Sequence, residues 1–155
     1  MHVVLVEPEI PHNTGNIVRT CAATGTMLHL VGPLGFSMTD RYLKRAGLDY
    51  WDLAKVVRHQ NFAELRAQYP DNTFYFTSKR GLINYTEVNY TAADFLVFGS
   101  ETEGLPQRLL EDNMDFVLKI PKRKEARSLN LSNAVAIILF EALRQLKFNA
   151  EIPLE

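Results

Sequence analysis

The stretch Ser128-Leu129-Asn130-Leu131-Ser132-Asn133 directly precedes a segment without any charged residue, Ala134 to Phe140. Serine and asparagine are good N-cap residues of a helix, because their side chains accept hydrogen bonds from free backbone N–H groups. One helix start needs only one such side chain, and this stretch offers four. We therefore expect a helix to begin here, with the surplus hydroxyl and amide groups facing a ligand or another loop.

Segments typical of strands alternate with segments typical of helices along the rest of the 155-residue chain. Apolar runs predict strands over 3–6, 27–31, 55–58, 74–77, 95–98 and 116–120. Cap and stop signals predict helices over 13–23, 39–47, 61–69, 105–111 and 132–147. In particular, Asn13 and Asn61 are expected to cap helices, and Gly25 is expected to end the first one. This alternation favours an α/β fold with a mostly parallel sheet flanked by helices, in a single domain over 1–155.

The composition argues against several classes of protein. No window approaches the roughly 18 consecutive apolar residues of a membrane-spanning helix. Cys21 is the only cysteine, which excludes a disulfide within the chain and fits a reducing, cytoplasmic environment and a place in the core. The four histidines are scattered without the spacing of metal ligands, so no metal site is expected.

The carboxyl ends of the predicted strands are where a functional site is expected. In parallel sheets, ligands bind in the crevice beyond those ends. This rule gathers the loops after Val6, Thr77, Phe98 and Ile120 on one rim, and these loops hold most of the unusual polar residues and glycines.

The loop after the first strand leads into Asn13-Thr14-Gly15-Asn16-Ile17-Val18-Arg19. A helix N-terminus has free N–H groups and a partial positive charge, which suit an anion. Arg19, about a turn and a half into the predicted helix, could hold a phosphate. A cap followed by a surface arginine explains the same residues equally well. The glycine spacing is not that of a dinucleotide-binding fold, so an NAD-dependent enzyme is a poorly supported alternative.

A second loop carries two glycines, in Phe98-Gly99-Ser100-Glu101-Thr102-Glu103-Gly104-Leu105. Glycine lets the backbone approach a ligand closely or adopt a positive φ. The two carboxylates between the glycines could accept hydrogen bonds from the hydroxyl or amino groups of a ligand. An ordinary turn from a strand into a helix is the alternative interpretation.

Together, in this order and on one rim, the three motifs resemble those of the SPOUT superfamily of RNA 2′-O-methyltransferases. Asn13 to Asn16 with Arg19 is similar to its first motif, and Phe98 to Glu101 with Gly104-Leu105 to its second. Ile120-Pro121 with Ser128 to Ala134 is similar to its third. The resemblance covers essentially the whole chain and implies a C-terminal trefoil knot. Knots are almost absent from protein folds, so pattern analysis alone does not predict one.

The short length, without a separate RNA-binding domain, and the opening Glu7-Pro8-Glu9-Ile10-Pro11 resemble the minimal members of the superfamily. Such members 2′-O-methylate the wobble nucleotide 34, a cytidine or a modified uridine, in anticodon loops of leucine tRNAs. The motifs do not name the nucleotide, so another tRNA position or ribosomal RNA stays open as the target. A non-catalytic RNA-binding relative is a further alternative.

The resemblance implies S-adenosylmethionine as the methyl donor, S-adenosylhomocysteine as the product, and no metal. The residues expected to bind this cofactor or brace its loops are Phe76, Thr77, Gly99, Glu101, Gly104, Ile120, Ser128, Leu129 and Asn133. The residues expected at the reacting groups are Arg19, Asn16 and Asn130. Arg19 is expected to orient the target phosphate and ribose rather than to act as a base, because a guanidinium stays protonated.

Two basic clusters are candidate contacts to a tRNA substrate. Between Lys119 and Arg127 five of nine residues are basic, although the net charge of the chain is −1. A short basic run is often only a solvated loop, but RNA affinity rests largely on phosphate contacts. The expected contacts are Lys122, Arg123, Lys124 and Arg127, with Arg41, Lys44 and Arg45 as the second cluster. Phe36 is a candidate for stacking on a base or for packing in the core.

The last predicted helix is apolar on more than one side. Its core face consists of Val135, Ile138, Leu139, Ala142, Leu143 and Leu146. Ile137 and Phe140 lie outside that face, and a helix that is apolar nearly all round is buried on two sides. In a chain of this size we expect the second side to pack on another subunit, which predicts a homodimer formed through this helix and the first one.

Overall fold

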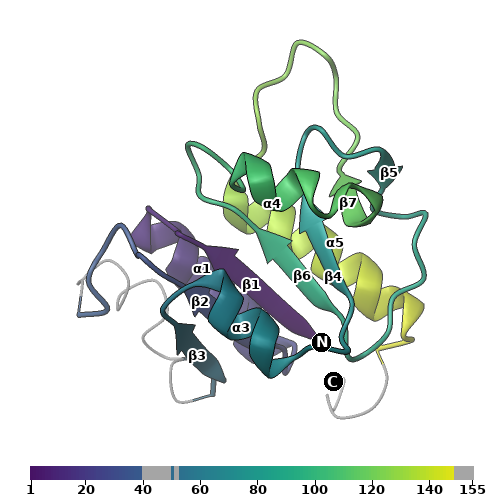
Figure 1. The fold of residues 1–155 in the computed structure, drawn as a ribbon. Coiled ribbons are helices and arrows are strands. Elements are labelled where there is room, and N and C mark those ends of the chain that lie inside the picture. Colours follow the sequence, from purple (N-terminus) through teal and green to yellow (C-terminus); the bar gives the residue numbers. More distant parts are fainter. Residues whose placement is uncertain (40–49, 51–52, 149–155) are drawn as a thin grey trace.

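The fold is a seven-stranded parallel sheet between two layers of helices (Figure 1). A computed structural model describes residues 1–39, 50 and 53–148. The strands are β1 (His2–Val6), β2 (Met27–Val31), β3 (Val56–His59), β4 (Phe74–Thr77), β5 (Ile83–Asn84), β6 (Phe95–Phe98) and β7 (Val117–Lys119). The helices are α1 (Pro11–Ala23), α3 (Phe62–Gln68), α4 (Gln107–Glu111), the 3-10 helix η1 (Met114–Phe116) and α5 (Leu131–Gln145). The predicted α/β class is confirmed.

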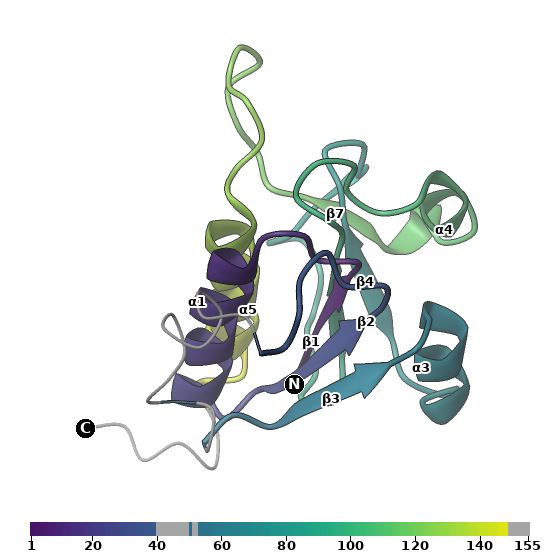
Figure 2. The ribbon, with the colours of Figure 1, turned by 90° about the vertical axis from the view of Figure 1, so that its left-hand side faces the viewer.

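The strand order is β3-β2-β1-β6-β4-β7-β5, and every neighbouring pair is parallel. Figure 2 shows α1 and α5 side by side on one face of the sheet, and α3 and α4 on the other. All carboxyl ends therefore meet at one rim, and the loop between β7 and α5 projects beyond it. Within the described residues, no helix is long and apolar enough to cross a membrane.

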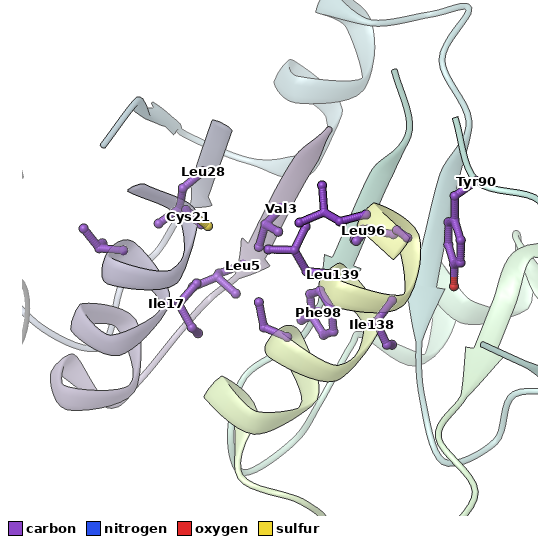
Figure 3. Close-up of a cluster of buried hydrophobic side chains, with 14 of the residues drawn as sticks. Val3, Leu5, Ile17, Cys21, Leu28, Tyr90, Leu96, Phe98, Ile138 and Leu139 are labelled. Atoms are coloured by element: carbon purple, nitrogen blue, oxygen red, sulfur yellow. The ribbon is translucent and has the colours of Figure 1, made fainter. Parts of the chain in front are cut away.

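The central strands are apolar throughout because helices cover both faces of the sheet. On one face, Val3 and Leu5 of β1 pack with Ile17 of α1 and with Ile138 and Leu139 of α5 (Figure 3). On the other face, the buried cluster includes Val4, Val6, Leu65, Phe74, Phe76, Phe95 and Val97. Burying a side chain of this size stabilises the fold by roughly 1.5–3 kcal/mol.

Local capping explains where two of the helices begin. Asn61 caps α3 as predicted, since its Oδ1 accepts from the backbone N–H of Glu64 at 2.9 Å. Asn130 caps α5, with its Oδ1 accepting from the backbone N–H of Ser132 at 2.9 Å. The buried face of α5 is the predicted one, except that Leu146, at the end of the helix, is only partly buried.

The predicted cap of α1 is wrong. This helix begins at Pro11, and its N-cap residue Ile10 makes no side-chain capping bond. Proline is favoured at the first position because its missing N–H needs no partner. Asn13 therefore lies inside the first turn and is buried. The predicted end of the helix is confirmed, since Gly25 adopts the left-handed conformation with φ of 65°.

One strand escaped the sequence analysis. β5 has only two residues, too few for a recognisable pattern, and pairs with β7 at the edge of the sheet. The connection from β4 to β5 passes very close to β7, since a Cβ on Gly81 would lie 2.5 Å from the carbonyl carbon of Leu118. The predicted helix over 39–47 falls, apart from Thr39, outside the described residues.

Three of the four histidines, far apart in the sequence, form a hydrogen-bonded chain across β1, β2 and β3. His2 Nδ1 lies 3.0 Å from His29 Nε2, and His29 Nδ1 lies 2.9 Å from His59 Nε2. Burial is the main cause that lowers the pKa of His29 to about 3 and that of His2 to about 4. Within the described residues, no group of metal-ligating side chains is arranged to hold an ion. Three histidines that are scattered in the sequence are therefore neighbours in the structure.

We expect the three bonded histidines to make the fold acid-sensitive, because histidines of the unfolded protein bind protons that the buried rings do not. Below pH 6.5 the unfolded state binds more protons, so stability should fall with pH down to about 3. For the fully buried His29 the slope approaches about 1.4 kcal/mol per pH unit. Urea unfolding measures the free energy of unfolding at pH 7 and at pH 5. The decrease between the two pH values should be smaller for His29→Phe than for the wild type. His12→Asn, an exposed control on α1, should keep the wild-type loss. Equal losses in all three proteins would contradict the expectation.

Candidate functional site

The three sequence motifs meet through the side-chain amide of Asn13. Its Nδ2 donates to Glu101 Oε1 at 3.0 Å, and its Oδ1 accepts from Asn130 Nδ2 at 3.0 Å. Asn130 in turn accepts from the backbone N–H and the hydroxyl of Ser132. One continuous hydrogen-bond network therefore links the start of α1, the loop after β6 and the start of α5.

Glu101 binds the backbone that leads into α1. Its carboxylate accepts from the backbone N–H groups of Glu9 at 2.8 Å and of Ile10 at 3.2 Å. Glu9 reciprocates, since its carboxylate accepts from the hydroxyl of Thr102 at 2.7 and 2.8 Å and from its backbone N–H at 3.3 Å. A carboxylate near a helix N-terminus is also favoured by the helix dipole. The loops that follow the neighbouring strands β1 and β6 are thus held together from both sides.

The second motif folds tightly on itself. Ser100 and Gly104 pair through two backbone hydrogen bonds, of 3.2 and 3.0 Å. A Cβ on Gly99 would lie 2.0 Å from the carbonyl carbon of Gly104, and Gly104 has a φ of 74°. The close backbone approach predicted for these glycines is present, and it is made by the loop itself. The turn therefore presents Glu101 in one fixed position.

The predicted cofactor residues Thr77, Gly99 and Ile120 lie at the ends of three strands that are neighbours in the sheet, β4, β6 and β7. Strand register brings these ends level, because Phe76 pairs with both Val97 and Val117. The ring of Phe76 is itself buried in the core on the α3 side. Only its backbone can therefore take part in a site on the rim.

The loop over 120–130 carries the remaining predicted contacts. Ser128 and Leu129 are exposed, and within the described residues their backbone N–H groups donate to no acceptor. Asn133 is exposed on the first turn of α5. The predicted RNA contacts Lys122, Arg123, Lys124 and Arg127 are all exposed on this projecting loop (Figure 2). The second basic cluster, Arg41, Lys44 and Arg45, lies outside the described residues.

Arg19 lies farther along α1 than the sequence suggested. Because the helix begins at Pro11, Arg19 is more than two turns, about 12 Å, from its N-terminus. The anion site predicted at the helix N-terminus and Arg19 are therefore farther apart along the helix than the sequence suggested. Arg19 is exposed and contacts Tyr50, with Nη2 3.5 Å from the hydroxyl and Cζ 4.8 Å from the ring centroid. Asn16 is partly buried, and its carbonyl oxygen accepts from the hydroxyl of Thr20.

Sequence reasoning missed Glu9, Thr102 and Tyr50 as parts of this arrangement. Their partners are 31 to 93 residues away along the chain, so no local pattern marks them. A hollow of about 300 Å³ between α3 and α4, at the ends of β1 and β2, contains none of the predicted site residues.

Comparison with known proteins assigns this arrangement to a family. The model of the SpoU rRNA methylase family matches residues 1–140. The chain belongs to the SpoU rRNA methylase family. The match includes all three motifs entirely, which agrees with the resemblance that the motifs suggested.

Relatives within this SpoU family share nearly the whole chain. A tRNA (cytidine(34)-2′-O)-methyltransferase of Saccharophagus degradans (strain 2-40) is 48% identical over 148 residues, which span 95% of this chain and 96% of the relative. A structure solved to explain the 2-OH methylation of C/U34 on tRNA is 44% identical, with a TM-score of 0.90, and the match covers 96% of this chain and 97% of that one.

A more distant member was solved with its cofactor. The SpoU methyltransferase AviRb of Streptomyces viridochromogenes, in complex with AdoMet, is 27% identical with a TM-score of 0.84. The match covers 96% of this chain and 61% of AviRb. The α/β fold of this chain is thus shared both by relatives of similar length and by a larger protein.

The amide bridge can be tested by its effect on stability. Asn13→Ala removes both bonds and leaves Glu101 and Asn130 without one partner each, so we expect a loss of about 1–3 kcal/mol in the free energy of unfolding. Asn16→Ala, on the same helix, removes an amide that makes no side-chain hydrogen bond within the described residues. That control should change stability by less than about 0.5 kcal/mol. Urea denaturation measures both, and equal effects would show that the bridge contributes nothing specific.

Proposed function

We propose that the protein transfers a methyl group from S-adenosylmethionine to the ribose 2′-hydroxyl of nucleotide 34 in the anticodon loop of leucine tRNA. The observation that carries this proposal is the 48% identity, over nearly the full length of both chains, with a relative named tRNA (cytidine(34)-2′-O)-methyltransferase. The Glu101–Asn13–Asn130 network supports it, because it assembles all three motifs at one rim of the sheet.

The residues at this rim fit a cofactor with an adenine ring and polar edges. Free backbone N–H groups at Ser128 and Leu129 can pair with the ring edge, and the Leu129 side chain, 42% exposed, can cover its apolar face. S-adenosylmethionine would supply an electrophilic methyl group on a sulfonium sulfur. Thr77, Gly99 and Ile120 would hold it through their backbone, and Glu101, Gly104 and Asn133 would keep the surrounding loops in place.

The chain's own residues would act by positioning. Arg19 would hold the target phosphate and ribose, because its planar guanidinium can bind phosphate oxygens with two parallel hydrogen bonds. Tyr50 supports this orientation by lying against the guanidinium. Asn130 and Asn16 would contact the ribose or its neighbours. Holding the 2′-oxygen in line with the methyl carbon lowers the barrier, since it removes the entropy cost of bringing the reactants together.

Recognition of the tRNA would rest on the projecting loop. Lys122, Arg123, Lys124 and Arg127 place four cations beside Ser128 and Leu129, and Arg41, Lys44 and Arg45 would extend the contact. We propose that the single domain over 1–155 carries both the cofactor loops and these RNA contacts. We propose a cytoplasmic location, which suits a tRNA substrate.

The segment after β7 is proposed to thread a trefoil knot. The strand order supports this, because β7 lies between β4 and β5 and the connection of those two strands must cross over it. The close approach of Gly81 to Leu118 marks that crossing. The last segment would then pass through the loop so formed before α5 begins.

The activity is tested by incubating the protein with labelled S-adenosylmethionine and total tRNA from a strain that lacks the enzyme, followed by nucleoside mass spectrometry. A 2′-O-methylated nucleotide 34 in leucine tRNA is expected. Label at another tRNA position, or in ribosomal RNA offered in a parallel reaction, would move the target within the same chemistry. No label in any RNA would refute the enzyme.

Arg19→Ala is expected to abolish transfer while the affinity for S-adenosylhomocysteine stays nearly unchanged, because Arg19 lies outside the predicted cofactor loops. Calorimetry measures the affinity, and single-turnover kinetics the transfer. Arg108→Ala, which removes an exposed arginine of α4, is the matched control and should keep normal turnover. Turnover of the Arg19 variant close to that of the control would contradict the positioning role.

We also propose that α1 and α5 form the interface of a homodimer. These helices lie side by side on one face of the sheet (Figure 2), and the outer side of α5 carries Phe140, 47% exposed, and the partly buried Ile137. Light scattering should give the mass of a dimer for the wild type and of a monomer for Phe140→Glu. Leu82→Glu places the same charge on a leucine that is 70% exposed and should stay dimeric. A monomeric wild type would refute the interface.

A further inference from the structure

A hollow of about 870 Å³ lies at the carboxyl ends of β2 and β3, apart from the predicted cofactor loops. One wall is the segment over 33–39 that follows β2, and the other is the end of β3 over 58–60, with Glu64 of α3. Figure 2 shows the chain after β2 running back toward α1 above this edge of the sheet. The hollow therefore opens on the same rim as the three motifs.

The side chains of this hollow suit a flat ring with polar edges. Phe36 is only partly buried and belongs to neither core cluster, whereas Leu34 and Met38 on either side of it pack on the core. Arg58 is exposed and forms no ion pair within the described residues. Gln60 adds an exposed side-chain amide. Aromatic, guanidinium and amide groups together are the side chains that recognise unstacked RNA bases.

The ring of His59 does not face this hollow. Consecutive residues of a strand point to opposite faces of the sheet, so this ring lies on the face opposite the Arg58 side chain, where its Nε2 is bonded to His29. Its Nδ1 is buried and has no hydrogen-bond partner within the described residues. The polar groups available in the hollow are therefore those of Arg58 and Gln60.

The distance across the sheet from the hollow to the predicted cofactor loops limits which nucleotide the hollow can bind. From β3 to β6 there are three strand spacings, about 14 Å. A base in the hollow therefore cannot belong to the nucleotide whose ribose lies at the cofactor loops, and must come from a nucleotide near it. The wall is also tied to the motif network, since Gly35 donates to Pro8 at 2.9 Å and a Cβ on it would lie 2.8 Å from the Cα of Glu9.

We propose that this hollow binds one unstacked base of the RNA substrate, from a nucleotide close to the methylated one. Phe36 stacks on the base, Arg58 contacts its edge or its phosphate, and Gln60 faces its polar edge. The site selects the RNA by reading a second base, whereas the cofactor loops hold the reacting one. This inference rests on the proposed function.

The test measures energetic coupling between the hollow and one nucleotide. The substrates are the anticodon stem–loop RNA and copies in which each nucleotide flanking position 34 is made abasic in turn. The proteins are the wild type, Phe36→Leu, Arg58→Gln and the control Lys55→Gln, which removes a cation at the opposite end of β3. The readout is kcat/KM, with melting temperature and S-adenosylhomocysteine affinity showing that each variant is folded.

For the wild type and Lys55→Gln, one abasic position should lower kcat/KM about tenfold, equivalent to about 1.4 kcal/mol. On the intact RNA, Phe36→Leu and Arg58→Gln should lower kcat/KM by a similar factor. Changing to that abasic RNA should lower their kcat/KM little further, because the effects of removing two groups that contact each other are not additive. If the variant and the abasic change lower kcat/KM by factors that multiply at every position, the hollow is not a base site. The proposed function would be unaffected by that result. A wild type that methylates no RNA would overturn both.

Discussion

The side-chain amide of Asn13 is the interaction on which the rest of the site depends. It donates to Glu101 and accepts from Asn130, so a single buried group joins loops that leave β1, β6 and β7. An aspartate could not donate and an apolar residue could do neither. Because Asn13 is 5% exposed, water cannot replace a lost partner, and each bond is required for the geometry of the rim.

That constraint organises the neighbouring backbone. Glu101 can reach the start of α1 only because the Gly99–Gly104 turn holds it there, and Gly99 permits that turn since no Cβ would fit. Glu101 thereby fixes the two residues that lead into α1, Glu9 and Ile10. The same loop over 7–10 supports the segment over 33–39 through Gly35. One rigid frame thus extends from the predicted cofactor loops to the hollow beside β3, and leaves the basic loop over 120–130 projecting.

Residues whose neighbours are close in sequence were interpreted correctly from sequence alone. The apolar runs over 3–6 and 95–98 are strands because both faces of the sheet are covered, and Asn61 caps α3 because its partner Glu64 is three residues away. Asn13 fits the same local rule but caps no helix, because α1 already begins at Pro11. Its amide instead bonds both Glu101 and Asn130, which are 88 and 117 residues away. The histidines looked unrelated for the same reason, since register between parallel strands decides that their rings meet.

The sequence by itself determined the α/β class, most strand and helix positions, and the three motifs, because apolar patterning and capping act over a few residues. Only the tertiary structure decided the strand order, the start of α1, the distance of Arg19 from that start, and which polar side chains are paired. These features depend on contacts between loops at the ends of different strands. Such contacts form only when long stretches of chain have already been packed, so no local pattern carries them.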